Sequence, residues 1–152
     1  MMIETFSFLG IHLSDTLLQM RRYLSHEFEL KKVGMKFEEW IQILPITKEE
    51  GLNQKQLSER LAKDKTTISR MVDGWVKKGW VKRIQTREDK RVFGLVLTGK
   101  GKLIWEKGLP VVRDADQIFK KNLSEENEKE LYMILFKIQS SLQFSETKNV
   151  PY

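Results

Sequence analysis

The feature that most constrains the fold is the segment 52–98, in which two short helical patterns are followed by two β-prone runs. Asn53 precedes Gln56 by three residues, and this spacing is typical of a capping box, in which each side chain binds the other residue's backbone N–H. Asp64 is a second N-cap candidate, after a turn around Ala62 and Lys63. Glycine ends many helices, so Gly79 marks the end of the second one. The segment therefore predicts two helices joined by a short turn, the second spanning about 64–78.

The second helix has two different faces. Its apolar residues recur at helical spacing and predict a face that packs on the first helix: Ile68, Met71, Val72, Trp75 and Val76. Its other face carries mostly short polar and cationic side chains: Lys65, Thr66, Thr67, Ser69, Arg70, Asp73 and Lys77. Two helices in this arrangement are typical of a helix-turn-helix.

A β-hairpin is predicted directly after the second helix. Trp80–Gln85 and Val92–Leu97 are β-prone, and the stretch between them, Thr86–Arg91, has no apolar residue. One interpretation of that tip is a solvated charged turn. Because it follows a helix-turn-helix, we favour a projecting wing whose arginines reach a DNA minor groove.

These motifs resemble the MarR family of winged-helix transcription regulators. Asp89 and Arg91 match the family's D-x-R pattern in the wing, and Leu97-Thr98 with Gly101 match its LT-x-x-G entry into the next helix. The chain departs from the family at Gly74, inside the second helix, and at Trp75, where leucine is usual. The resemblance implies a mainly α fold with a small β-hairpin wing, in which N- and C-terminal helices intertwine in a symmetric dimer.

The chain ends have the composition that such a dimerisation region needs. Residues 6–30 form an apolar helical pattern, and 35–47 form a second one that Pro45 ends or kinks. A long helix is expected from Thr98 to about 122, interrupted at Gly108 and Pro110 by a kink. The last helix begins at the cap Ser124 and carries a near-heptad stripe: Leu131, Ile134, Leu135, Ile138 and Leu142. Such a stripe is often ordinary core, but here no third layer covers it, so we favour burial between subunits.

We therefore divide one structural domain into four segments. Residues 1–34 are an N-terminal dimerisation helix, 35–98 a winged helix-turn-helix lobe, 99–145 the C-terminal dimerisation helices, and 146–152 a tail expected to be disordered.

Positive charge is concentrated on the middle of the chain. The formal net charge is +6, but residues 63–107 carry +8 and the remainder −2. This distribution is the electrostatic footprint of a nucleic-acid-binding protein.

Other classes of function have little support in the sequence. There is no cysteine, so thiol-based oxidant sensing is excluded. His12 and His26 lie about four helical turns apart, too far to share a metal ion, and we expect no metal or cofactor. No nucleotide-binding or nucleophile motif occurs, and we expect no enzymatic activity. With no membrane-length apolar run and no export pattern, we expect a cytoplasmic protein.

Candidate DNA contacts follow from the helix-turn-helix pattern. Thr66 and Thr67 lie in the first turn of the second helix, the part that meets base edges in the major groove. Arg70, one turn further on, can bind a guanine through two hydrogen bonds. Lys65 and Ser69 are better placed for phosphates. The alternative for the threonines is that they only favour the start of a helix.

The family resemblance adds the wing and a possible effector. It implies that Arg91 enters the minor groove while Asp89 orients its guanidinium, and that Arg87 and Lys90 contact phosphates. It also implies a possible small amphipathic or aromatic ligand between the dimer helices and the winged lobe. Candidate residues for lining that crevice, each equally compatible with plain packing, are His12, Arg21, Tyr23 and Trp40.

The leading hypothesis is a homodimeric transcription regulator, with repression the favoured direction, that binds a pseudo-palindromic duplex. The alternative is a winged-helix module that binds a partner protein, or binds DNA without sequence preference. A partner-binding helix would expose aromatic or apolar anchors, whereas the outer face of 64–78 carries threonine, serine, arginine and lysine.

Overall fold

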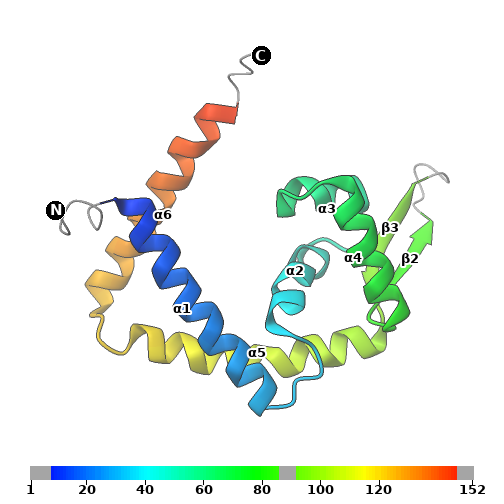
Figure 1. Cartoon of the computed structure of the whole chain (residues 1–152), viewed down its shortest axis with the longest axis horizontal. Coiled ribbons are helices and arrows are strands. Elements are labelled where there is room, and N and C mark those ends of the chain that lie inside the picture. Colours follow the sequence, from blue (N-terminus) through cyan, green and yellow to red (C-terminus); the bar gives the residue numbers. More distant parts are fainter. Residues whose placement is uncertain (1–7, 86–91, 147–152) are drawn as a thin grey trace. The chain divides into compact units, whose positions relative to one another are not determined.

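The computed structural model describes residues 8–85 and 92–146, which form six α-helices and one three-stranded sheet (Figure 1). In chain order the elements are α1 (Leu9–Leu30), α2 (Phe37–Lys48), β1 (Leu52–Asn53), α3 (Gln54–Leu61), α4 (Lys65–Lys77), β2 (Val81–Gln85), β3 (Phe93–Leu97), α5 (Gly99–Lys120) and α6 (Glu125–Glu146). The predicted mainly α fold with a small β-hairpin is confirmed.

The chain divides into two compact units, Met1–Ala115 and Asp116–Tyr152, and each is described by itself. The boundary between the units lies inside α5. These two units do not correspond to the predicted dimerisation and DNA-binding segments, and that functional division stays a prediction.

The sheet of the first unit has the strand order β1-β3-β2 and is antiparallel throughout. The predicted hairpin pairs β2 with β3, from Val81 opposite Leu97 to Gln85 opposite Phe93. The sequence pattern did not indicate β1, whose two residues pair with Leu95 and Gly94 on the other edge of β3. Gly94 permits this pairing, because a Cβ there would lie 2.6 Å from the carbonyl oxygen of Gly51.

An aromatic cluster joins α1, α2 and α5 within the first unit. The Trp40 indole stacks on that of Trp105, with ring centroids 3.9 Å apart and an interplanar angle of 5°. Phe28 meets both Phe37 and Trp40 edge to face, at centroid distances of 5.3 and 5.7 Å. Trp40 Nε1 also donates a hydrogen bond of 3.1 Å to the carbonyl of Trp105. The start of α5 is therefore fixed to α2 by both packing and a directional bond.

Two prolines lie inside helices that continue beyond them. Of the two interpretations of Pro45, an end to α2 is excluded, because α2 continues to Lys48. Gly108 and Pro110 do not end α5, which runs from Gly99 to Lys120, and the predicted kink there stays a prediction. A proline removes one helix hydrogen bond, but burial of the residues beyond it favours continuation. Those residues are Ile46 in α2 and Val111 and Ala115 in α5, all buried.

The second unit consists of the end of α5 and α6. Ser124 caps α6 as predicted, since its Oγ accepts a hydrogen bond from the Asn127 N–H. The Lys120 ammonium binds the carboxylates of Asp116 and Glu128 at 2.7 and 2.6 Å, and these bonds raise the pKa of Lys120. From 125 to 142 no residue of α6 is buried. In the residues that the structure describes, no helix combines the length and apolar character needed to cross a membrane.

Candidate nucleic-acid interface

The N-terminus of α4 is fixed by Asp64, as the sequence predicts. One oxygen of its carboxylate accepts the backbone N–H of Thr67 at 2.9 Å, and the other accepts the Thr67 hydroxyl at 2.5 Å. Both bonds lower the pKa of Asp64, and the bond from the Thr67 hydroxyl has the larger effect. The cap therefore engages the Thr67 hydroxyl as a donor, which leaves that group only its acceptor capacity for a ligand.

One side of α4 is deeply buried and the other faces solvent. Ile68 and Val72 are 0% exposed and Trp75 is 2% exposed, so the predicted apolar face is confirmed and the unusual Trp75 fits the core. On the opposite side Lys65, Thr66, Arg70, Asp73 and Lys77 are exposed, while Thr67 and Ser69 are partly buried. Burial of the apolar face fixes the orientation of α4 about its own axis, so the polar residues of the opposite face are all directed toward solvent.

Helix α3 provides the support against which α4 packs (Figure 1). The predicted capping box is present, with Asn53 and Gln56 exchanging two hydrogen bonds of 2.9 Å. Leu57 is fully buried. In the turn into α4, Ala62 adopts the left-handed conformation with φ 48°. The backbone N–H of Lys63 donates a hydrogen bond of 3.2 Å to the backbone carbonyl of Ser58. This turn fixes where α4 begins relative to α3.

The base of the wing is well defined. Val81, Leu95 and Val96 are buried, whereas residues 82–85 of β2 are exposed. The Thr98 hydroxyl accepts the N–H of Gly101 at 3.0 Å, which confirms Thr98 as the cap of α5. The wing candidates Arg87, Asp89, Lys90 and Arg91 lie in 86–91, outside the described residues.

Sequence reasoning missed one contact that joins these elements. The Arg83 guanidinium binds Asp73 Oδ1 at 2.6 Å, and its Nε and one terminal nitrogen bind Gln54 Oε1 at 3.3 and 3.2 Å. The three residues lie in β2, α4 and α3. No periodic pattern relates residues on three different elements, so only the folded structure shows that they meet.

The candidate ligand residues lie in different environments. His12 and Arg21 are exposed on α1, and Arg21 lies 3.8 Å from the Glu38 carboxylate. Tyr23 is partly buried, and Trp40 is 4% exposed in the aromatic cluster. None of these four residues lines the hollow at the C-terminal end of α4 or the smaller hollow beside Trp105.

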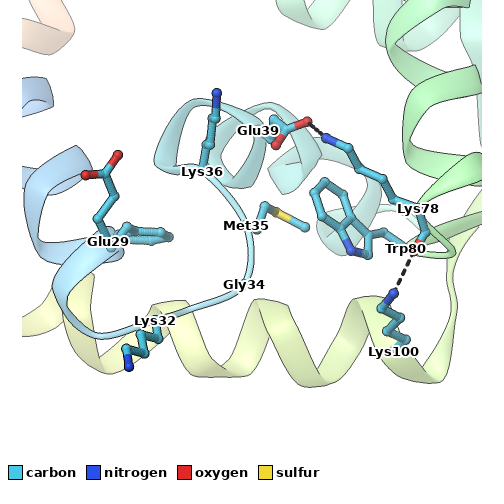
Figure 2. A pocket seen from close by; sticks show the side chains of 10 residues that line it. Glu29, Lys32, Gly34, Met35, Lys36, Glu39, Lys78, Trp80 and Lys100 are labelled. Carbon is cyan, nitrogen blue, oxygen red and sulfur yellow. Dashed lines mark hydrogen bonds and ion pairs between the residues drawn. The ribbon is translucent and has the colours of Figure 1, made fainter.

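The larger hollow, about 570 Å³, lies at the C-terminal end of α4 and is shown in Figure 2. Its rim carries lysines, but Lys78 binds the Glu39 carboxylate and lies 4.5 Å from the centre of the Trp80 ring. The Lys100 ammonium donates to the Lys78 carbonyl at 2.9 Å. In Figure 2 the ammonium groups of Lys32 and Lys36 point away from the hollow. The lysines therefore do not converge on a common point where an anion could bind. Within 8–85 and 92–146 no cluster of three potential metal ligands occurs.

Comparison with known proteins agrees with this geometry. Residues 33–92 match the family model described as MarR family. The apo form of wild-type MarR from E. coli superposes with a TM-score of 0.73 at 26% identity, covering 86% of this chain and 96% of that one. The matched segment and this superposition support the MarR family as the family of the chain. Its α3, α4 and hairpin have the arrangement of the winged helix-turn-helix in MarR-family transcription regulators.

Two curated relatives are also transcriptional regulators by name. BilQ of Clostridium symbiosum is 29% identical over 72% of this chain and 76% of its own length. SarZ of Staphylococcus saprophyticus is 33% identical over 66% of this chain and 64% of its own length. A cysteine-to-serine mutant of E. coli MarR complexed with operator DNA superposes with a TM-score of 0.77 at 26% identity, covering 86% of this chain and 92% of that one.

Proposed function

We propose that this chain is a cytoplasmic, homodimeric transcription regulator that binds a pseudo-palindromic DNA duplex through the N-terminal half of α4. The observation that carries the proposal is the outward face of α4, whose exposed polar and cationic residues are backed by a fully buried stripe. The E. coli MarR mutant, similar in fold and 26% identical, is complexed with operator DNA. An exposed Thr and Arg face suits base edges and phosphates, whereas a protein-binding helix would present aromatic anchors.

Roles within this face follow from position. Thr66 lies in the first turn and Arg70 one turn later, so both can reach base edges when this end enters the major groove. Arg70 supplies the two donors that recognise guanine. Lys65, Ser69 and Lys77 bind phosphates at the flanks. Thr67 contributes chiefly through the cap that it forms with Asp64.

In the wing we propose that Arg91 binds in the minor groove and that Asp89 holds its guanidinium, with Arg87 and Lys90 on phosphates. The D-x-R resemblance supports this assignment. A double-mutant cycle of Asp89→Ala and Arg91→Ala tests it, because Asp89 has nothing to orient once Arg91 is gone. If Asp89→Ala tightened binding and its effect added strictly to that of Arg91→Ala, the tip would be only a charged turn.

Assembly as a homodimer is supported by the apolar surface of the chain ends. In α6, Met133, Ile134 and Phe136 are 59%, 45% and 68% exposed. In α1, Leu9 and Leu17 are 57% and 50% exposed. Large apolar side chains exposed repeatedly along one helix mark surfaces that are buried on association. A second copy of the chain presents the same faces and so provides a symmetric partner.

Selection of bound sequences from a random duplex pool tests the proposal. A sequence-specific dimer enriches two inverted half-sites whose centres lie about one helical turn apart, roughly 10 bp. Enrichment of no sequence would instead favour a partner-binding or architectural module. Repression, and release by a small amphipathic or aromatic compound, are further proposals from the family resemblance. They are tested by transcription from a template carrying the selected site, with and without candidate compounds.

A further inference from the structure

The Arg83 bridge, formed by Arg83 with Asp73 and Gln54, connects the wing to both helices of the helix-turn-helix. One guanidinium reaches the middle of α4 through Asp73 and the first residue of α3 through Gln54. Arginine is suited to this task because its donors project in a rigid plane and can satisfy two acceptors at once. β2 is an edge strand that pairs with β3 on one side only, and the bridge gives it additional contacts with the two helices.

The bridge also accounts for a charge of the wrong sign. Asp73 is exposed on the polar side of α4, where a carboxylate opposes the approach of phosphates. Its side chain is 63% exposed, and that of Arg83 is 31% exposed. An exposed ion pair contributes little to stability, so stability alone is a weak reason for these residues. Their geometry, in contrast, fixes the distance from β2 to α4.

We propose that Asp73 and Arg83 are positioning residues, which hold β2 in a fixed orientation against α4 so that the wing and α4 contact one duplex together. This inference rests on the proposed function. Arg83, although cationic and next to the interface, acts through Asp73 and Gln54 and is not a phosphate ligand. The bridge therefore sets specificity, because only a correctly spaced site satisfies both contacts.

The proposal predicts effects opposite to those of simple charge. Asp73→Ala removes a negative charge near phosphate, and charge alone would tighten binding to every duplex. We expect instead that it weakens binding to the selected duplex by about tenfold, within the coupling range of contacting residues, and leaves a shuffled duplex nearly unchanged. Arg83→Lys keeps the charge but cannot reach both acceptors, so we expect a similar loss. The double variant should lose no more than either single one.

Lys82→Gln is the matched control, since Lys82 neighbours Arg83 on β2 and, in the part of the chain described, forms no ion pair. We expect it to weaken the selected and shuffled duplexes alike, through the loss of one charge. The proposal is overturned if Asp73→Ala maintains or tightens binding to the selected duplex, or if Arg83→Lys behaves like the parent.

A readout without DNA separates this inference from the proposed function. Amide hydrogen exchange over Val81–Gln85 should accelerate roughly two- to fivefold in Asp73→Ala and Arg83→Lys, which is the range of an exposed pair, and stay unchanged in Lys82→Gln. If the parent enriches no sequence from the duplex pool, the proposed function fails. The bridge as a structural tie is then judged by exchange alone, and unchanged exchange in both variants overturns it.

Discussion

Replacing Gly108 by Ala should destabilise the protein, although the same replacement inside a helix ordinarily stabilises it. Gly108 lies where α5 crosses the Trp40 indole, and a Cβ there would lie 2.2 Å from Nε1 and 2.8 Å from Cδ1. Contacts this short do not persist, so either the indole or α5 has to move. The indole is held by its stack on Trp105 and its hydrogen bond to the Trp105 carbonyl.

The expected magnitude follows from three terms. Forcing an extra methyl group into a packed core costs about 1–3 kcal/mol. Displacing the indole also breaks its part-buried hydrogen bond, which costs about 1 kcal/mol more. Against these, replacing Gly by Ala in a helix contributes about 1 kcal/mol of stability. We therefore expect Gly108→Ala to lower the free energy of unfolding by about 1–3 kcal/mol.

Gly74→Ala is the matched control, because a Cβ at Gly74 meets nothing within 4 Å. It should raise the free energy of unfolding by about 1 kcal/mol, which corresponds to about 2–4 °C in Tm for a chain of this size. Both variants are compared with the parent by urea and thermal unfolding at one protomer concentration, since association shifts apparent stability. If Gly108→Ala stabilised the protein as much as Gly74→Ala, the close packing of α5 on Trp40 would be refuted.

Three further predictions concern recognition, assembly and pH. Arg70→Ala should weaken DNA binding by about 1–3 kcal/mol and relax the base preference at one position per half-site. Lys65→Ala should weaken binding to all sequences alike and reduce the slope of log affinity against log salt concentration by about one. Filter binding on variant duplexes checks both expectations. An Arg70→Ala variant with parental affinity and preference would contradict the assignment. Leu135→Glu should convert the dimer to a monomer or unfold the protein, because the substitution places a charge in the apolar surface expected between the subunits. Sedimentation that showed a folded monomer for the parent would refute this dimer interface. Because folding lowers the pKa of Asp64, its carboxylate stabilises the fold above its unfolded pKa of about 3.9, and this contribution disappears as pH falls through the folded pKa. The parent should therefore lose its stability advantage over Asp64→Asn in that acid range. A difference in urea midpoint between the two proteins that stays constant from pH 7 to 3 would contradict this role of Asp64.

The sequence predicted best what is decided within a few residues. The capping box of Asn53 and Gln56, the cap at Asp64 and the helix end at Gly79 are local signals, and each matches the structure. The buried stripe of α4 was also predictable, because helical periodicity determines which side chains share a face. Local chemistry and periodicity therefore predicted the helices of the candidate interface, whereas their contacts with DNA stay a prediction.

Features that depend on distant residues were not predictable. The two residues of β1 are too few to form a recognisable pattern, and they become a strand only because β3 lies beside them. Gly108 is a predicted kink position in the sequence, since propensity alone disfavours glycine in a helix. In the structure it provides the space that Trp40 occupies against α5. Similarly, Arg83 has no local signal for its bridge to Asp73.

The central claim, sequence-specific duplex binding, is tested most directly by the affinity of the parent protein for two duplexes. One carries the sequence enriched from the random pool, and the other is a shuffled duplex of the same composition, with both measured over a range of salt concentrations. We predict at least about 10³-fold tighter binding to the selected duplex at physiological salt, with both affinities falling as salt rises. Equal affinities for the two duplexes at every salt concentration would contradict the claim.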